Sequence, residues 1–125
     1  MRSMLLFALP LLLAATGNDM PRRAQLAGDW VVDLSVKPNE PYTRPMQLEL
    51  KDDGTVAGLF YQSPIDAGRW KIDRGRICAS FRTHDERGPY HSTACVVGDG
   101  VQGQTWAEAR NFLFNWNAVR GTIAP

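Results

Sequence analysis

The chain has 125 residues, with 14 lysines and arginines against 13 aspartates and glutamates, and a formal net charge of +1 at pH 7. This length predicts a single domain, and the near-neutral charge argues against nucleic acid as the main partner. With 44% hydrophobic and 22% charged residues, the composition is typical of a folded chain rather than a disordered one. It identifies neither a substrate nor a reaction.

The first 17 residues have the pattern of a secretory signal peptide. Arg2 gives a positive start, twelve almost entirely apolar residues follow at 4–15, and small residues lie at 15–17. A transmembrane anchor is the weaker alternative, because the run is too short to span a bilayer and Pro10 interrupts it. Cleavage near Gly17 would leave 13 basic and 13 acidic residues. We expect a periplasmic or secreted protein that is soluble and has no membrane span.

The rest of the chain divides into a polar N-terminal arm at 18–26, a barrel domain at 27–120 and a C-terminal tail at 121–125. From residue 28 onward, apolar and polar residues alternate with the period of strands rather than helices. The predicted strands lie at 30–35, 46–51, 55–62, 68–72, 76–83, 90–96, 101–105 and 111–119. The last segment has a helical alternative, but its asparagines and even-numbered aromatic residues favour a strand.

Eight consecutive strands joined by short turns predict an all-β fold, an eight-stranded antiparallel up-and-down barrel. An open sheet of this size would leave two unpaired edges, and closure removes them. A two-layer sandwich is the alternative. A barrel of eight strands is just wide enough to be filled by side chains or to hold one small ligand.

The start of the first strand, Leu26-Ala27-Gly28-Asp29-Trp30, resembles the calycins, the superfamily of lipocalins, fatty-acid-binding proteins and avidins. In calycins the tryptophan closes the base of the barrel and an arginine of the last strand packs across it, which implies that Arg120 packs on Trp30. A guanidinium over an indole is a favourable pair. Gly58 followed by Tyr61-Gln62-Ser63 resembles the third strand of avidin, with one extra residue between glycine and tyrosine. The resemblance implies a calycin-like fold and not biotin binding.

Cys78 and Cys95 are the two cysteines of the chain. Exported proteins fold under oxidising conditions, so a disulfide is expected. If the strands at 76–83 and 90–96 pair around a turn at 85–88, with partner numbers that sum to 173, the two cysteines lie directly opposite each other. We therefore predict a structural disulfide that contributes roughly 3 kcal/mol to stability.

His84, Asp85 and His91 bracket the same hairpin, and such a set suits zinc by residue type. The register above places His91 on the outer face and His84 at the hairpin tip, so solvated turn residues are the preferred interpretation, and general acid–base catalysis is a third. The acidic pairs at 52–53 and 85–86 fall in turns, which aspartate favours. No nucleophile elbow or phosphate-binding loop occurs. We therefore assign no catalytic residue, metal or cofactor, and an enzyme is the less favoured interpretation.

Side-chain size varies around the predicted inner face. Several strands direct large side chains inward, whereas those between 76 and 105 direct small ones, such as Ala79, Ala94 and Gly103. Tight packing pairs large with small residues. The alternative is a lopsided cavity with an aromatic wall and a few hydroxyls, which suits a small, mostly apolar ligand. The predicted ligand-binding residues are Trp70, Phe81, Thr83, Tyr90, Ser92, Thr105 and Phe114.

A second hypothesis is a protein-binding module, such as a periplasmic inhibitor or an envelope-associated partner. Its contact patch would lie on the outer face of the barrel, formed by Leu59, Tyr61, Trp106 and Leu113. A pocket in the barrel would favour the ligand carrier. A filled barrel with a continuous outer patch would favour the module. Neither the identity of the ligand nor the oligomeric state follows from the sequence.

Overall fold

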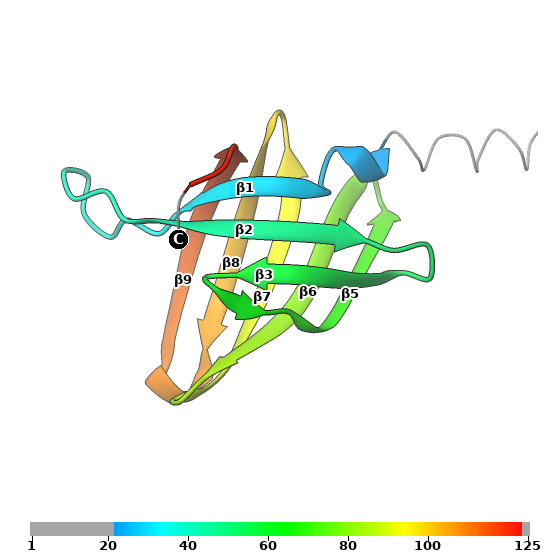
Figure 1. The fold of residues 1–125 in the computed structure, drawn as a ribbon. Coiled ribbons are helices and arrows are strands. Elements are labelled where there is room, and N and C mark those ends of the chain that lie inside the picture. Colours follow the sequence, from blue (N-terminus) through cyan, green and yellow to red (C-terminus); the bar gives the residue numbers. More distant parts are fainter. Residues whose placement is uncertain (1–21, 124–125) are drawn as a thin grey trace, which may run out of the picture.

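A computed structural model describes residues 22–123, which form a closed eight-stranded antiparallel β-barrel (Figure 1). The fold class predicted from the sequence is therefore confirmed. The expected signal peptide lies outside the described residues. The elements are β1 (Gly28–Asp33), β2 (Thr43–Leu50), β3 (Thr55–Phe60), β4 (Ser63–Pro64), β5 (Asp66–Asp73), β6 (Arg76–Asp85), β7 (Gly88–Val97), β8 (Gly100–Ala107), the 3-10 helix η1 (Glu108–Arg110) and β9 (Phe112–Arg120). Within residues 22–123, no helix is long and apolar enough to cross a membrane.

The barrel closes because β9 returns to pair with β1, with Arg120 opposite Trp30. Eight strands form the ring, and each pairs with its neighbour on either side. The ninth, β4, has two residues, pairs only with β3 and is not part of the ring. The contact between β3 and β5 is short, since it joins Thr55 to Arg69 and Val56 to Gly68. The closed ring rules out the sandwich, and the strand β9 rules out a helix at the end of the chain.

The period-two pattern explains the core. In β6 the buried residues are Ile77, Ala79, Phe81 and Thr83, and the residues between them face outward. The partner numbers of β6 and β7 sum to 173, as predicted, so Cys78 is opposite Cys95. The two cysteines form a disulfide with 4.1 Å between their Cα atoms, and they alternate with the inward row. A disulfide is compatible with an extracellular, oxidising location.

The base of the barrel is closed by Trp30, as the resemblance implies. Its indole Nε1 donates a hydrogen bond of 2.8 Å to the carbonyl of Leu26. The guanidinium of Arg120 lies 4.0 Å from the Trp30 ring and donates to the carbonyls of Ala24 and Ala27. Leu26 is fully buried. The end of the expected arm is therefore packed into the barrel, because an apolar side chain and two backbone carbonyls find partners there.

Candidate ligand-binding cavity

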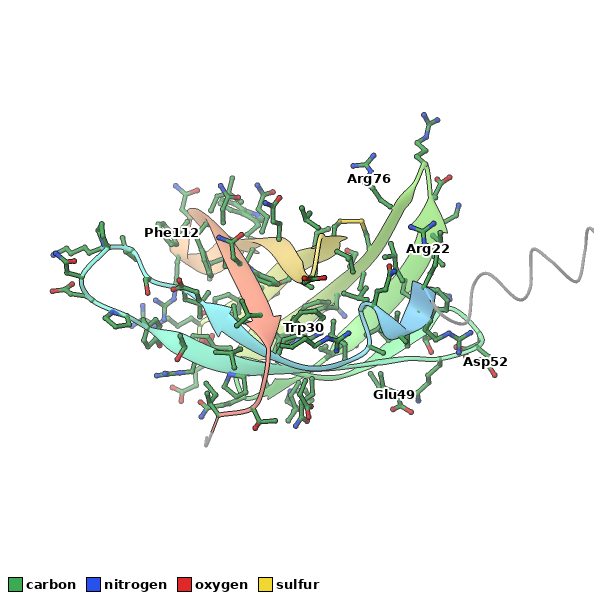
Figure 2. The ribbon with its side chains drawn as sticks, turned by 90° about the horizontal axis from the view of Figure 1, so that it is seen from above. Arg22, Trp30, Glu49, Asp52, Arg76 and Phe112 are labelled. Carbon is green, nitrogen blue, oxygen red and sulfur yellow. A yellow bond between two sulfur atoms is a disulfide. The ribbon has the colours of Figure 1, made fainter. Side chains whose placement is uncertain are left out.

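A cavity of about 830 Å³ lies at the end of the barrel opposite the Trp30–Arg120 base. Its lining comes from the loop between β1 and β2, the end of β3, the β3–β4 turn, the β6–β7 hairpin, the end of β8, η1 and the start of β9. Figure 2 shows Phe112, one of the lining residues, at one end of the molecule, with Asp52 and Arg22 at the other. We call the end around Phe112 the mouth.

The apolar wall of the cavity is largely aromatic. Phe60 lines it and packs edge-on against Phe81, with ring centroids 5.5 Å apart. Its ring is tilted against that of Trp116, with centroids 5.2 Å apart. Phe112 and Phe114 stack at 5.4 Å and line another part. Phe112 is 48% exposed, whereas Phe60 is 3% exposed. The aromatic lining therefore runs from the packed core to solvent.

Hydroxyl groups lie on the inner wall. Thr105 lines the cavity, and its Oγ1 accepts a hydrogen bond of 2.9 Å from the Trp116 indole and lies 2.8 Å from Ser92 Oγ. A hydroxyl has one donor and two acceptor sites, so these two contacts leave Thr105 one further hydrogen bond. Thr83 also lines the cavity. Both threonines are almost fully buried, and they could orient a polar atom of a bound molecule.

A hydrogen-bonded chain of three side chains lies at the mouth. The Tyr90 hydroxyl donates to Asp85 Oδ2 at 2.6 Å, and Arg110 Nε donates to the Tyr90 oxygen at 3.0 Å. The hydrogen bond from Tyr90 lowers the pKa of the Asp85 carboxyl, and the backbone N–H of Arg87 adds to this effect. Burial raises the pKa of Tyr90, and the bond to Asp85 raises it further. At neutral pH the tyrosine is therefore neutral and the Asp85 carboxyl is charged.

Of the seven predicted ligand-binding residues, Thr83, Tyr90, Thr105 and Phe114 line the cavity. The other three, Trp70, Phe81 and Ser92, are not in the cavity lining. Ser92 bonds to Thr105, which lines the cavity, and Phe81 packs on Phe60.

Trp70 belongs to the other end of the barrel. Its indole donates a 2.8 Å hydrogen bond to the carbonyl of Lys51, and its ring lies 4.9 Å from the Arg23 guanidinium. Arg23 also forms an ion pair with Asp52. Trp70 thus packs under the N-terminal segment and not beside the cavity, where the sequence pattern places it.

The small inward residues Ala79, Ala94 and Gly103 do not line the cavity. A Cβ atom added to Gly103 would lie 2.2 Å from the ring of Trp116, so the indole occupies the space that the glycine leaves. Ala94, opposite Gly103 on β7, is fully buried and is not in the cavity lining. Tight packing of large against small residues holds at Gly103, and the cavity lies nearer the mouth.

Several lining residues were missed from the sequence. Phe60 occupies an inward period-two position of β3 and was identifiable by that signal. Tyr42 and Val36 lie in or beside the long loop before β2, and Arg110 lies in η1. Period-two alternation does not describe loops, so the sequence pattern gives no signal for Tyr42 and Val36. Arg110 shares the even-numbered face of Phe112 and Phe114, which is the signal that could have found it.

The histidines contact different carboxylates. His84 Nδ1 lies 3.9 Å from Asp66, and His91 Nε2 lies 2.9 Å from Glu108. Asp85 instead accepts the hydroxyl of Tyr90. Among residues 22–123, no three His, Cys, Asp or Glu side chains gather closely enough to hold a metal ion.

The outer apolar residues of the second hypothesis do not form one patch. Trp106 and Leu113 lie opposite each other on β8 and β9. Leu59 lies on β3, which is separated from β8 by three strands around the ring. Tyr61 lines the cavity at the mouth.

Comparison of the chain with models of protein families, with curated proteins and with solved structures found no match. The closed eight-stranded barrel with its Trp30–Arg120 base is consistent with a calycin-like layout.

Proposed function

We propose that this protein is an exported, calycin-like carrier that binds one small, mostly apolar molecule and does not transform it. The observation that carries the proposal is the cavity of about 830 Å³ at the mouth of the barrel. Its size is that of typical small-molecule sites, which range from roughly 300 to 1,000 Å³. Such sites combine a hydrophobic and aromatic lining with a few polar groups that orient the ligand.

The lining fits this description. Phe60, Phe112 and Phe114 provide aromatic surface, and Thr83 and Thr105 provide hydroxyls on the inner wall. Export is supported by the signal-peptide pattern of residues 1–17 and by the disulfide on the outer face. The protein-binding module is less well supported, since its outer residues are spread around the ring.

Native mass spectrometry of the protein purified after export tests the proposal directly. We expect an additional mass from a co-purified small molecule, lost after partial denaturation and refolding. The refolded protein should then bind the neutral fluorescent probe N-phenyl-1-naphthylamine. No added mass together with no binding of this probe would contradict the carrier and favour the protein-binding module.

A further inference from the structure

We infer that the ligand carries an anionic group, which Arg110 binds at the mouth while the apolar body of the molecule lies against the aromatic wall. This inference rests on the proposed carrier function and defines its ligand class. The anionic group is a carboxylate or a similar oxyanion that can accept two hydrogen bonds from one guanidinium.

The first argument is the state of the charged groups. Asp85 and Arg110 are the two charged residues in the cavity lining. Both oxygens of Asp85 are occupied, Oδ1 by the backbone N–H of Arg87 at 2.8 Å and Oδ2 by the hydroxyl of Tyr90 at 2.6 Å. Each carboxylate oxygen therefore already accepts one hydrogen bond from the protein, which leaves Asp85 less available to a cationic ligand than a carboxylate without partners.

Arg110 is in the opposite state. Its Nε donates to the Tyr90 hydroxyl at 3.0 Å, which holds the base of the guanidinium in place. Within residues 22–123, its two terminal nitrogens have no hydrogen-bond acceptor and no ion-pair partner. A guanidinium presents such nitrogens as a planar fork, which matches the two oxygens of a carboxylate or sulfonate.

The second argument is the position of Arg110 beside the apolar wall. Asn111 has a left-handed backbone, with φ of 53°, and separates η1 from β9. Phe112 follows it directly and Phe114 comes two residues later, and their rings are stacked 5.4 Å apart. An anionic group on Arg110 thus stays near solvent while an attached apolar body extends along these rings into the cavity.

A second cation adds to the positive potential at the mouth. The guanidinium of Arg44 lies 4.3 Å from the ring of Tyr42 and 5.2 Å from that of Tyr61, and both tyrosines line the cavity. Among the described residues that line the cavity or contact its tyrosines in this way, the two positive charges of Arg44 and Arg110 outnumber the negative charge of Asp85, which makes the mouth more favourable for an anion than for a cation.

Two probes with the same ring system test the inference. N-phenyl-1-naphthylamine is neutral, and 8-anilinonaphthalene-1-sulfonate is the same molecule with one sulfonate. Both dissociation constants are measured by fluorescence for the exported protein and for the Arg110→Gln and Arg76→Gln variants. Arg76 is an exposed arginine at the start of β6, outside the cavity lining, so it is the matched control for the loss of one charge.

We expect each probe to displace the other, because both occupy one cavity. Arg110→Gln should weaken sulfonate binding roughly fivefold and change the neutral probe by less than about twofold, the scale of an exposed but bidentate ion pair. Arg76→Gln should change neither. Salt should weaken the sulfonate complex of the original protein and have little effect on that of Arg110→Gln. The dissociation constant of Arg110→Lys for the sulfonate probe should lie between those of the original protein and Arg110→Gln, because lysine keeps the positive charge but lacks the planar pair of donors.

The outcomes separate the two proposals. If both probes bind and Arg110→Gln weakens them equally, or leaves both unchanged, the anionic ligand is overturned and the carrier stands. If the neutral probe does not bind the original protein at all, the carrier itself fails, and this inference fails with it. Thermal melting of each variant identifies unfolding, which would weaken both probes together.

Discussion

At the residue scale, one arginine explains a short sequence motif. The guanidinium of Arg120 passes over the indole of Trp30 and close to Gly28. A Cβ atom at Gly28 would lie 2.7 Å from Arg120 Nη1, and the backbone φ of Gly28 is +114°, which side chains other than glycine rarely adopt. The glycine, the tryptophan and the distant arginine of the calycin-like resemblance are therefore one packing unit that closes the base of the barrel.

Replacing Arg120 by Ala should lower the free energy of unfolding by about 1–3 kcal/mol, because the cation–π contact and the packing of the side-chain stem are both lost. Its hydrogen bonds to the carbonyls of Ala24 and Ala27 would also be lost, which loosens the N-terminal segment. Urea denaturation followed by tryptophan fluorescence measures the change. Arg76→Ala is the exposed control and should alter the midpoint little. If Arg120→Ala unfolds at the same urea concentration as the original protein, the packing of Gly28, Trp30 and Arg120 does not stabilise the base.

At the scale of the elements, aspartates stabilise three chain reversals in the same way. In each, a carboxylate oxygen accepts the backbone N–H two residues further on, namely Asp33 from Ser35, Asp53 from Thr55 and Asp85 from Arg87. This is the Asx-turn geometry. Hydrogen bonds lower the pKa of all three carboxyls, with the largest contributions from Ser35, Thr55 and Tyr90 respectively.

The sign of the pH dependence follows for Asp85. Its folded pKa lies below the unfolded value of about 3.9, so its stabilising effect is present above that pH and is lost as pH falls through the folded pKa. Asp85→Asn should lower the melting temperature at pH 7, and the difference from the original protein should shrink below about pH 4. Melting curves from pH 7 to pH 2.5 test this. A constant difference across the range would show that the charge of Asp85 does not contribute.

The disulfide belongs to the β6–β7 pair. Non-reducing peptide mapping of the exported protein should recover the Cys78–Cys95 bridge. The double variant Cys78→Ala/Cys95→Ala should lose roughly 3 kcal/mol, because the bridge closes a loop with a sequence separation of 17. Since both cysteines face outward, the core residues remain packed and the variant should keep its β-sheet circular dichroism. Two free thiols in the exported protein would contradict both the bridge and the oxidising location.

The strands were more predictable than the site, for a physical reason. Alternation along a strand separates inward from outward residues, and it placed Phe81, Tyr90 and Thr105 correctly on the inner side. It does not give the height of a residue along the barrel axis, which depends on strand tilt and register around the whole ring. Alternation therefore assigns Trp70 to a cavity that lies at the other end of the barrel, and it does not separate Arg110, which lines the cavity, from Arg120, which closes the base.

At the scale of the whole molecule, the two ends of the barrel differ. The base is packed by Trp30, Leu26 and Met46, all almost fully buried. At the mouth, Tyr42, Tyr61 and Phe112 are exposed around the cavity. A barrel of eight strands can be either filled or hollow, and this one is filled at one end and hollow at the other. If the proposed function holds, stability and binding depend on different residues of the same inner face.

A pair of identical substitutions tests this division. Ala94 on β7 and Ala107 on β8 are both buried alanines of neighbouring strands, but only Ala107 lines the cavity. Ala94→Leu should cost about 1–3 kcal/mol by overpacking, as added bulk in a filled core does. Ala107→Leu can extend into the cavity, so its free energy of unfolding should change little or rise. Thermal and urea unfolding of the two variants, measured side by side, give the comparison.

Binding should respond in the opposite order. Ala107→Leu reduces the space of the cavity and should weaken N-phenyl-1-naphthylamine, whereas Ala94→Leu, if folded at the working temperature, should bind it as the original protein does. Each alanine is thus the control for the other, once in stability and once in binding. Equal destabilisation by both substitutions would show that the mouth is packed like the core. If both substitutions destabilise the protein equally and the probe also fails to bind the original protein, the outer surface is left as the functional face.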